Sequence, residues 1–265
     1  MRLAACPVRG RRQPARRWRS RPRPVAVALA GTLAAGALAA GALAFGIAAF
    51  GPALLPRAAA DEAPPPCDGR PWVASIAAFE ADDARRPAPP GAIVFVGSSS
   101  IRLWNLPASF PGLPVLNRGF GGSQLCDTVH FFDVLVARHR PAHVVVYAGD
   151  NDLAAGKSPE AVRADFAALT ERMRQTLPDA GLIYIAIKPS VARRALAPRM
   201  REANRLIAEH CARRPGCRFL DVWPAMLDER GEPRRELLAD DGLHLSASGY
   251  ALWTRQLLPL LAGTP

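Results

Sequence analysis

Short apolar runs alternate with longer amphipathic stretches through most of the chain after residue 71. The short runs are apolar and contain many β-branched residues, a pattern typical of strands that are buried on both faces. They cover residues 93–96, 115–117, 143–148, 182–187 and 218–222. Between them, apolar positions recur at helical spacing. This spacing predicts helices over residues 73–84, 123–137, 159–176, 198–213 and 247–261.

Strands and helices that alternate in this way predict an α/β fold. We expect a three-layer α/β/α sandwich around a mainly parallel five-stranded sheet, because parallel strands need crossover helices on the faces of the sheet. In such sheets, ligands bind beyond the carboxyl ends of the strands. Polar motifs that contain glycine follow the first three predicted strands directly, so we expect these motifs to lie at this edge.

The segment before residue 72 differs in composition from the rest of the chain. We predict a basic cytoplasmic tail over residues 1–24, a transmembrane anchor or signal segment over residues 25–55, and a proline-rich linker over residues 56–71 that leads to a domain at residues 72–265. Residues 25–51 carry no charge and are long enough to span a bilayer as a helix. The arginine-rich flank favours a cytoplasmic start.

Two interpretations of this apolar segment stay open. A retained anchor agrees with its length, whereas a cleaved signal peptide agrees with the small residues Ala58-Ala59-Ala60 behind it. Both interpretations predict that the domain is exported, to the periplasm or another extracytoplasmic space. A retained segment would attach the domain to the inner membrane.

The net charge of +11 arises almost entirely before the predicted domain. Residues 1–57 contain ten arginines and no acidic residue, which leaves 24 basic against 23 acidic residues in the rest of the chain. A nucleic-acid surface needs basic charge gathered on a folded face. We therefore expect no nucleic-acid partner.

Four cysteines lie beyond the apolar segment, at positions 67, 126, 211 and 217. Export makes disulfides possible, and four cysteines allow three pairings that sequence alone does not distinguish. Cys211 and Cys217 enclose a short loop and are the most evident candidate pair, although two separately packed thiols would also fit. No cysteine or histidine has a partner at a spacing that suggests a metal site, so we expect no metal.

Three strand-end motifs carry groups that can serve acyl transfer. Gly97-Ser98-Ser99-Ser100 places a hydroxyl and free backbone N–H groups at a strand-to-helix turn. Gly119-Phe120-Gly121-Gly122 lets backbone approach a ligand closely, and Gly149-Asp150-Asn151-Asp152 offers a side-chain amide. Each motif alone could equally be a polar turn or a helix cap.

A fourth motif, Asp241-Gly242-Leu243-His244, is more specific. A three-residue spacing across a turn can bring the Asp241 carboxylate to Nδ1–H of His244. This contact would fix the tautomer and leave Nε2 free to accept a proton from a serine.

In this order, the four motifs resemble those of the SGNH/GDSL hydrolase family, and the resemblance covers essentially the whole predicted domain. It implies a flavodoxin-like SGNH hydrolase fold that cleaves esters without a cofactor. Ser99 would be the nucleophile, His244 the base and Asp241 the residue that orients it. The backbone N–H groups of Ser99 and Gly122 and the side chain of Asn151 would form the oxyanion hole. Ser98 departs from the family, which usually has Asp at this position.

The resemblance implies a small-molecule or carbohydrate ester as the substrate. We expect a serine esterase that acts on acetyl or short-chain esters, with envelope carbohydrates as a candidate class. An O-acyltransferase that uses the same acyl-enzyme, a lysophospholipase or thioesterase, and a binding module without catalysis are the alternatives. Arg102, Trp104 and Arg118 lie close to the first two motifs and could contact substrate, or could belong to the core and to ion pairs.

Overall fold

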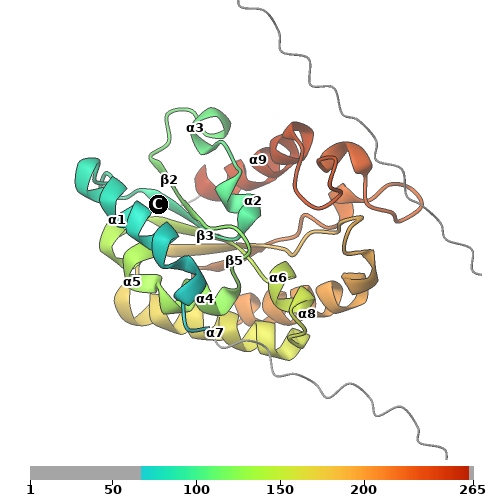
Figure 1. The fold of residues 1–265 in the computed structure, drawn as a ribbon, viewed down its shortest axis with the longest axis horizontal. Coiled ribbons are helices and arrows are strands. Elements are labelled where there is room, and N and C mark those ends of the chain that lie inside the picture. Colours follow the sequence, from blue (N-terminus) through green and yellow to red (C-terminus); the bar gives the residue numbers. More distant parts are fainter. Residues whose placement is uncertain (1–66, 263–265) are drawn as a thin grey trace, which may run out of the picture. The chain divides into compact units, whose positions relative to one another are not determined.

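A five-stranded parallel sheet forms the centre of residues 67–262, the part of the chain that the computed structural model describes (Figure 1). Strand β1 (Ile93–Gly97) lies between β2 (Val115–Gly119) and β3 (His143–Tyr147). Strands β4 (Gly181–Ile185) and β5 (Cys217–Leu220) follow on the side of β3. All four neighbouring pairs are parallel. The α/β fold and all five predicted strands are confirmed, each strand to within two residues at either end.

Helices cover both faces of the sheet, as the three-layer prediction requires (Figure 1). One layer contains α1 (Val73–Arg85), α7 (Pro159–Thr176) and α8 (Ala197–Ala212). The other contains α3 (Leu106–Ser109) and α9 (Ala247–Ala262). These helices confirm four of the five predicted helical ranges. The predicted start of α7 is also confirmed, because Ser158 Oγ accepts the N–H of Ala161 at 3.2 Å.

Side chains alternate between two hydrophobic cores because successive residues of a strand face opposite sides of the sheet. In β1, Val94 and Val96 belong to the core under α7 and α8, whereas Phe95 belongs to the core under α9. Every residue of β1 and β3 is buried, which explains why these strands are continuous apolar runs in the sequence.

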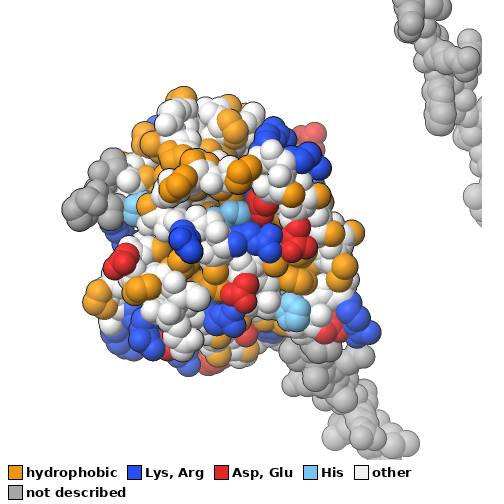
Figure 2. All heavy atoms as spheres, turned by 90° about the vertical axis from the view of Figure 1, so that its left-hand side faces the viewer, with side chains coloured by type: hydrophobic (Ala, Val, Ile, Leu, Met, Phe, Trp, Pro, Cys, Tyr) orange, Lys and Arg blue, Asp and Glu red, His pale blue; other side chains and the backbone are white. Residues whose placement is uncertain are grey.

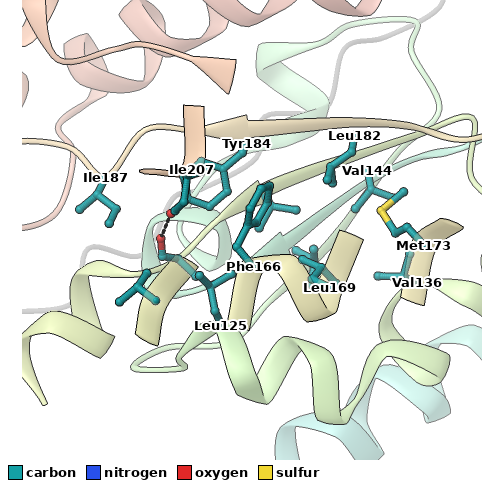
Figure 3. Packing of buried hydrophobic residues seen from close by; sticks show 14 of the residues in the cluster. Leu125, Val136, Val144, Phe166, Leu169, Met173, Leu182, Tyr184, Ile187 and Ile207 are labelled. Atoms are coloured by element: carbon teal, nitrogen blue, oxygen red, sulfur yellow. Dashed lines mark hydrogen bonds between the residues drawn. The ribbon is translucent and has the colours of Figure 1, made fainter. Parts of the chain in front are cut away.

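In the core on the α7 side, residues of α7 pack against residues of the sheet and of neighbouring helices (Figure 3). Phe166 packs edge-on against Tyr184 of β4, with 4.8 Å between the ring centroids. The Tyr184 hydroxyl is buried and donates to the carbonyl of Ala148 at 2.6 Å. This bond ties β4 to the residue that follows β3, close to the third glycine-containing motif.

The predicted helix over residues 123–137 is wrong as a single element. The structure divides it into α4 (Leu125–His130), α5 (Phe132–Leu135) and a 3₁₀ turn. The break falls at Phe131, whose φ of −97° and ψ of 18° leave the helical range. The new direction places the Phe132 side chain fully inside the core, so tertiary packing overrides the helical periodicity.

Two disulfides join the four cysteines, one between Cys67 and Cys126 and one between Cys211 and Cys217. The second is the pair that the short loop suggested. The first connects a residue of the predicted linker to α4.

The predicted basic tail and apolar segment lie outside the described residues. Among residues 67–262, no helix combines the length and the hydropathy needed to cross a membrane. The face on the left of Figure 1 shows acidic, basic and apolar side chains interspersed (Figure 2). This mixture agrees with the near balance of charges after residue 57.

Candidate active site

The first three motifs meet at one edge of the sheet, because β1, β2 and β3 are parallel neighbours. Gly97 ends β1 with a φ of 129°, and a Cβ atom there would lie 2.0 Å from the carbonyl oxygen of Tyr147 in β3. Only glycine fits this position. The close approach of the two strands brings the Ser99 turn beside the turn that follows β3.

Ser99 is the first residue of the short helix α2 (Ser99–Arg102). The N–H groups of a first helical turn have no acceptor within the helix, so they are free to face an oxyanion. The side chain of Asn117 in β2 stabilises α2 and the turn that follows it. Its NH₂ group donates to the carbonyl of Ile101 at 2.7 Å and to that of Trp104 at 3.2 Å.

Ser99, His244 and Asp241 form a continuous chain of hydrogen-bonding groups. Ser99 Oγ lies 2.9 Å from Nε2 of His244 although 145 positions separate the two residues. Nδ1 of His244 lies 2.6 Å from Oδ2 of Asp241. The ring therefore has a carboxylate on one nitrogen and a hydroxyl on the other, which is the arrangement that activates a serine.

The Asp241 carboxylate is strongly stabilised in its ionised form. The side chain of His244 and the backbone N–H groups of Leu243 and His244 all donate to it, and these bonds hold its pKa well below the ordinary value of 3.8. Half of the Asp241 side chain and 27% of the His244 side chain are exposed. The proposed base is therefore open to solvent and to a bulky substrate.

A hydrogen bond joins the segments that carry Gly122 and Asn151. Asn151 lies in the first turn of α6 (Asp150–Ala154), and its Nδ2 donates to the carbonyl of Ser123, the residue after Gly122, at 3.0 Å. Gly122 has a φ of 83°. A Cβ atom at this position would lie 3.1 Å from the edge of the Trp72 ring, so the Trp72 side chain packs next to Gly122.

Sequence reasoning missed Lys188 and Arg193, the two cations that lie next to Asp150. Asp150 lies between two cations, with its Oδ2 3.0 Å from Nη1 of Arg193 and 3.9 Å from Nζ of Lys188. Lys188 is fully buried, and desolvation lowers its pKa while Asp150 acts in the opposite direction. Asp150 lies in the third motif, but no periodic or motif signal marks Lys188 or Arg193, since Arg193 stands beside Arg194 and resembles an ordinary surface charge.

Asp152, which ends the third motif, is completely buried. It accepts the backbone N–H of Leu125 at 3.1 Å, and Lys157 lies 3.2 Å from the same carboxylate oxygen. Burial raises the pKa of Asp152 to about 6, against the opposing influence of Lys157 and of the Leu125 N–H.

Two of the candidate substrate contacts have structural roles instead. Trp104 is buried in the core under α9, where its ring packs against Phe95. The Arg118 side chain is buried and forms an ion pair with Asp83 of α1. Arg102 is exposed, and its Nε lies 3.0 Å from the place that a Cβ atom on Gly121 would take.

Two groups of described residues have atoms close enough together to hold a metal ion, and both contain Cys126. The sulfur of Cys126 is bonded to Cys67, so it is not available as a thiolate ligand. Lys157 also pairs with Asp152 and Asp165 of the second group, at 3.2 Å and 2.7 Å. These residues do not fit a cation site while the disulfide is intact.

Several solved structures share this fold, and the match spans nearly the whole length of each of those chains. They include a GDSL-like lipase from Bacteroides thetaiotaomicron, which has a TM-score of 0.61 and 20% identity and matches 71% of this chain and 97% of its own. An acetyl-xylooligosaccharide esterase variant from Geobacillus Stearmophilus has a TM-score of 0.52 and 17% identity, with 67% and 97% covered.

A third solved structure is a carbohydrate esterase family 3 protein from Talaromyces cellulolyticus. It has a TM-score of 0.51 and 18% identity, and it matches 64% of this chain and 95% of its own. A sequence comparison with curated proteins gives no match. The sequence profile of the GDSL-like lipase/acylhydrolase family matches residues 99–252, which is more than half of the chain and includes the segment from Ser99 to His244. The chain therefore belongs to the GDSL-like lipase/acylhydrolase family.

Proposed function

We propose that this enzyme hydrolyses acetyl and other short acyl esters through a covalent acyl-enzyme on Ser99. The observation that carries the proposal is the chain from Ser99 Oγ to His244 Nε2 at 2.9 Å and from His244 Nδ1 to Asp241 Oδ2 at 2.6 Å. A hydroxyl in contact with an oriented imidazole is the arrangement required for nucleophilic attack on a carbonyl.

In the first half of the reaction, Ser99 Oγ attacks the carbonyl carbon of the ester, and its proton passes to Nε2 of His244. The carbonyl oxygen becomes an oxyanion, which the N–H groups of Ser99 and Gly122 and the side-chain NH₂ of Asn151 stabilise. When the tetrahedral intermediate collapses, the bond to the alcohol oxygen breaks. The leaving alcohol takes the proton from His244, and the acyl group stays on Ser99.

In the second half, a water molecule attacks the acyl-enzyme while His244 accepts one of its protons. The second tetrahedral intermediate uses the same oxyanion donors. Its collapse releases the carboxylic acid and returns the proton to Ser99 Oγ. Asp241 stays ionised throughout, because its pKa lies well below the ordinary value, and it stabilises the protonated ring in both halves.

The position of Trp72 supports the proposal that the acyl group is short. Its ring edge lies 3.1 Å from the place that a side chain on Gly122 would occupy, and it packs edge-on against Phe120 with 5.5 Å between the ring centroids. An indole ring in this position leaves little room for a long acyl chain beside the proposed oxyanion hole.

A carbohydrate is the alcohol that we propose. The open face of the Asp241 and His244 side chains would accept a bulky alcohol. Two proteins of the same fold are named as an acetyl-xylooligosaccharide esterase and as a member of carbohydrate esterase family 3. These names support the substrate class without identifying the sugar.

We also propose that the enzyme acts outside the cytoplasm. The uncharged segment at residues 25–51 supports export. The disulfides Cys67–Cys126 and Cys211–Cys217 support an oxidising compartment. Membrane attachment through the N-terminal segment is part of the same proposal.

A substrate series tests the proposed reaction and its specificity. The full-length enzyme would be assayed with p-nitrophenyl esters of two to eight acyl carbons and with acetylated xylo-oligosaccharides, with Ser99→Ala as the control. We expect the highest kcat/KM for acetyl esters, release of free acetate from the sugar, and no turnover by the variant. A preference for the longest esters would contradict the proposed substrate. Transfer of the acetyl group to an added sugar without release of acetate would contradict hydrolysis.

A further inference from the structure

Arg193 lies on the segment between β4 and α8 and contacts Asn151 of the proposed oxyanion hole. Its Nη2 donates to Oδ1 of Asn151 at 2.8 Å. Its Nη1 lies 3.0 Å from Oδ2 of Asp150, and only 18% of the Arg193 side chain is exposed. The two arms of one guanidinium therefore contact two consecutive residues of the turn that follows β3.

This contact and the bond to Ser123 together fix which way the Asn151 amide faces. A guanidinium has only donors, so the amide atom that faces Arg193 must be the carbonyl oxygen. The NH₂ group then points to the opposite side, where it donates to the carbonyl of Ser123 at 3.0 Å. One N–H bond is used in this way, and the other remains to face the oxyanion. An inverted amide would present its oxygen to the developing negative charge.

The charge on Arg193 also strengthens the donor. A hydrogen bond from a cation to the amide oxygen polarises the amide, and polarised groups donate more strongly through their N–H bonds. Asp150 is buried and lies 3.0 Å from Arg193, so the ion pair stabilises both groups in this position. Arg193 is thus held by contacts that do not involve substrate.

The same segment also contacts the turn that carries the proposed base. The N–H of Ala192 donates to the carbonyl of Gly242 at 3.1 Å. A Cβ atom on Gly242 would lie 3.2 Å from Cβ of Val191. Residues 191–193 therefore lie between the turn from Asp241 to His244 and the turn that carries Asn151, in contact with both.

We propose that Arg193 is a positioning residue of the oxyanion hole, which fixes and polarises the Asn151 amide so that its NH₂ group faces the reacting oxygen. The inference rests on the proposed ester hydrolysis and deepens it. It assigns to Arg193 a role that acts through Asn151, without any contact between Arg193 and the substrate.

A double-mutant cycle tests this role. Arg193→Met removes every donor but retains an unbranched side chain. Arg194→Met is the matched control, because the neighbouring Arg194 is 66% exposed and pairs with Glu232 away from the site. We expect Arg193→Met to lower kcat/KM for an acetyl ester by about 10- to 100-fold, mostly through kcat. Asn151→Ala should lower it by about 10²–10³-fold, the usual cost of one oxyanion donor. The control should stay within about twofold of the wild type.

The informative comparison is the double variant Arg193→Met with Asn151→Ala. If Arg193 acts through Asn151, the double variant is no slower than Asn151→Ala alone. An equal loss in both backgrounds would overturn the proposal and assign Arg193 a structural role. Arg193→Lys gives a second measurement if Arg193→Met does not fold. Lysine keeps the charge opposite Asp150 but lacks the fork that reaches two acceptors, so we expect a smaller loss in the same direction.

Failure of this inference can be told apart from failure of the proposed function. Reaction with a fluorophosphonate probe measures formation of a tetrahedral adduct on Ser99 independently of turnover. A wild-type enzyme that reacts at Ser99, with Arg193→Met and Arg193→Lys reacting equally fast, would overturn only the role of Arg193. A wild-type enzyme that neither reacts nor hydrolyses esters would overturn the proposed function, and the role of Arg193 with it.

Discussion

The carboxylate of Asp152 accepts the backbone N–H of Leu125 at 3.1 Å, although the two residues are 27 positions apart. Leu125 begins α4, just after the loop that carries Gly122. Asp152 lies in α6, next to Asn151. This bond and the bond from Asn151 to the carbonyl of Ser123 hold together the segments of Gly122 and Asn151, two of the three proposed oxyanion donors.

Removal of the Asp152 carboxylate should destabilise the fold. Asp152→Ala leaves the Leu125 N–H without its acceptor and leaves Lys157 with only the partly exposed Asp165 as its partner. The loss of one partner of a buried ion pair costs about 3–5 kcal/mol. Asp165→Asn is the control, because this second partner of Lys157 is 28% exposed. We expect the control to cost less than about 1 kcal/mol. Urea-induced unfolding measures both variants, and equal stabilities would contradict the assigned role of Asp152.

Asp241 should contribute no proton of its own to the acidic side of the pH–rate profile. Hydrogen bonds from His244 and from two backbone N–H groups lower the pKa of Asp241, so in the folded enzyme this carboxylate is ionised above its ordinary value of 3.8. The stabilising effect of these bonds is present above that pH and is lost only as the pH falls below it. We therefore expect no step in the profile of log kcat/KM against pH that arises from protonation of Asp241 above about pH 4.

The counterpart variant is Asp241→Asn, which keeps the shape of the side chain but favours the wrong tautomer of His244. We expect kcat to fall by about 10²–10⁴-fold with little change in KM, in line with the effect of this substitution in other triads. A step at about pH 4 in the wild type that is absent from the variant, or a variant with undiminished kcat, would argue against the role of Asp241.

Ser98 should be replaceable. Its side chain is buried, and Oγ has no hydrogen-bond partner among the described residues. An unpaired buried hydroxyl costs free energy that alanine does not. We expect Ser98→Ala to raise the free energy of unfolding by up to about 1 kcal/mol and to keep kcat/KM within about threefold of the wild type. A clear loss of stability would mean that the hydroxyl has a partner that these contacts do not include.

Trp72 should limit the length of the acyl chain. Trp72→Ala opens space beside Gly122, where the ring edge lies 3.1 Å from the position of a Cβ atom. Each buried methylene contributes about 0.8 kcal/mol, and a butanoyl group has two more methylenes than an acetyl group. The kcat/KM for a butanoyl ester relative to that for an acetyl ester should therefore rise about tenfold. Val73→Ala, at a neighbouring side chain that is 60% exposed, serves as the control. An unchanged ratio in Trp72→Ala would place the acyl group elsewhere.

The central strands of the sheet could be predicted because they are buried on both faces. β1 and β3 are buried at every residue and are therefore unbroken apolar runs in the sequence. The helix over residues 123–137 could not be predicted correctly, since the break at Phe131 depends on the position of Phe132 in the core. Local periodicity contains no information about that position.

The sequence likewise predicts some residues of the proposed site and not others. The sequence motifs directed attention to Ser99, Asn151 and His244 because each lies in a short segment next to a glycine or a strand end. Arg193 is 42 positions from Asn151, and its role depends on a contact between two separate loops. The partner of Cys126 was equally open, because several pairings satisfied the sequence and only the path of the chain brings Cys67 to it.

Covalent trapping on Ser99 tests the central claim most directly. The full-length enzyme would be incubated with a fluorophosphonate, digested, and analysed by mass spectrometry, beside Ser99→Ala and His244→Ala. We expect one adduct per chain, located on Ser99, absent in Ser99→Ala and formed far more slowly in His244→Ala. A wild-type chain without an adduct on Ser99, or a Ser99→Ala variant that hydrolyses acetyl esters at the wild-type rate, would contradict the proposed acyl-enzyme.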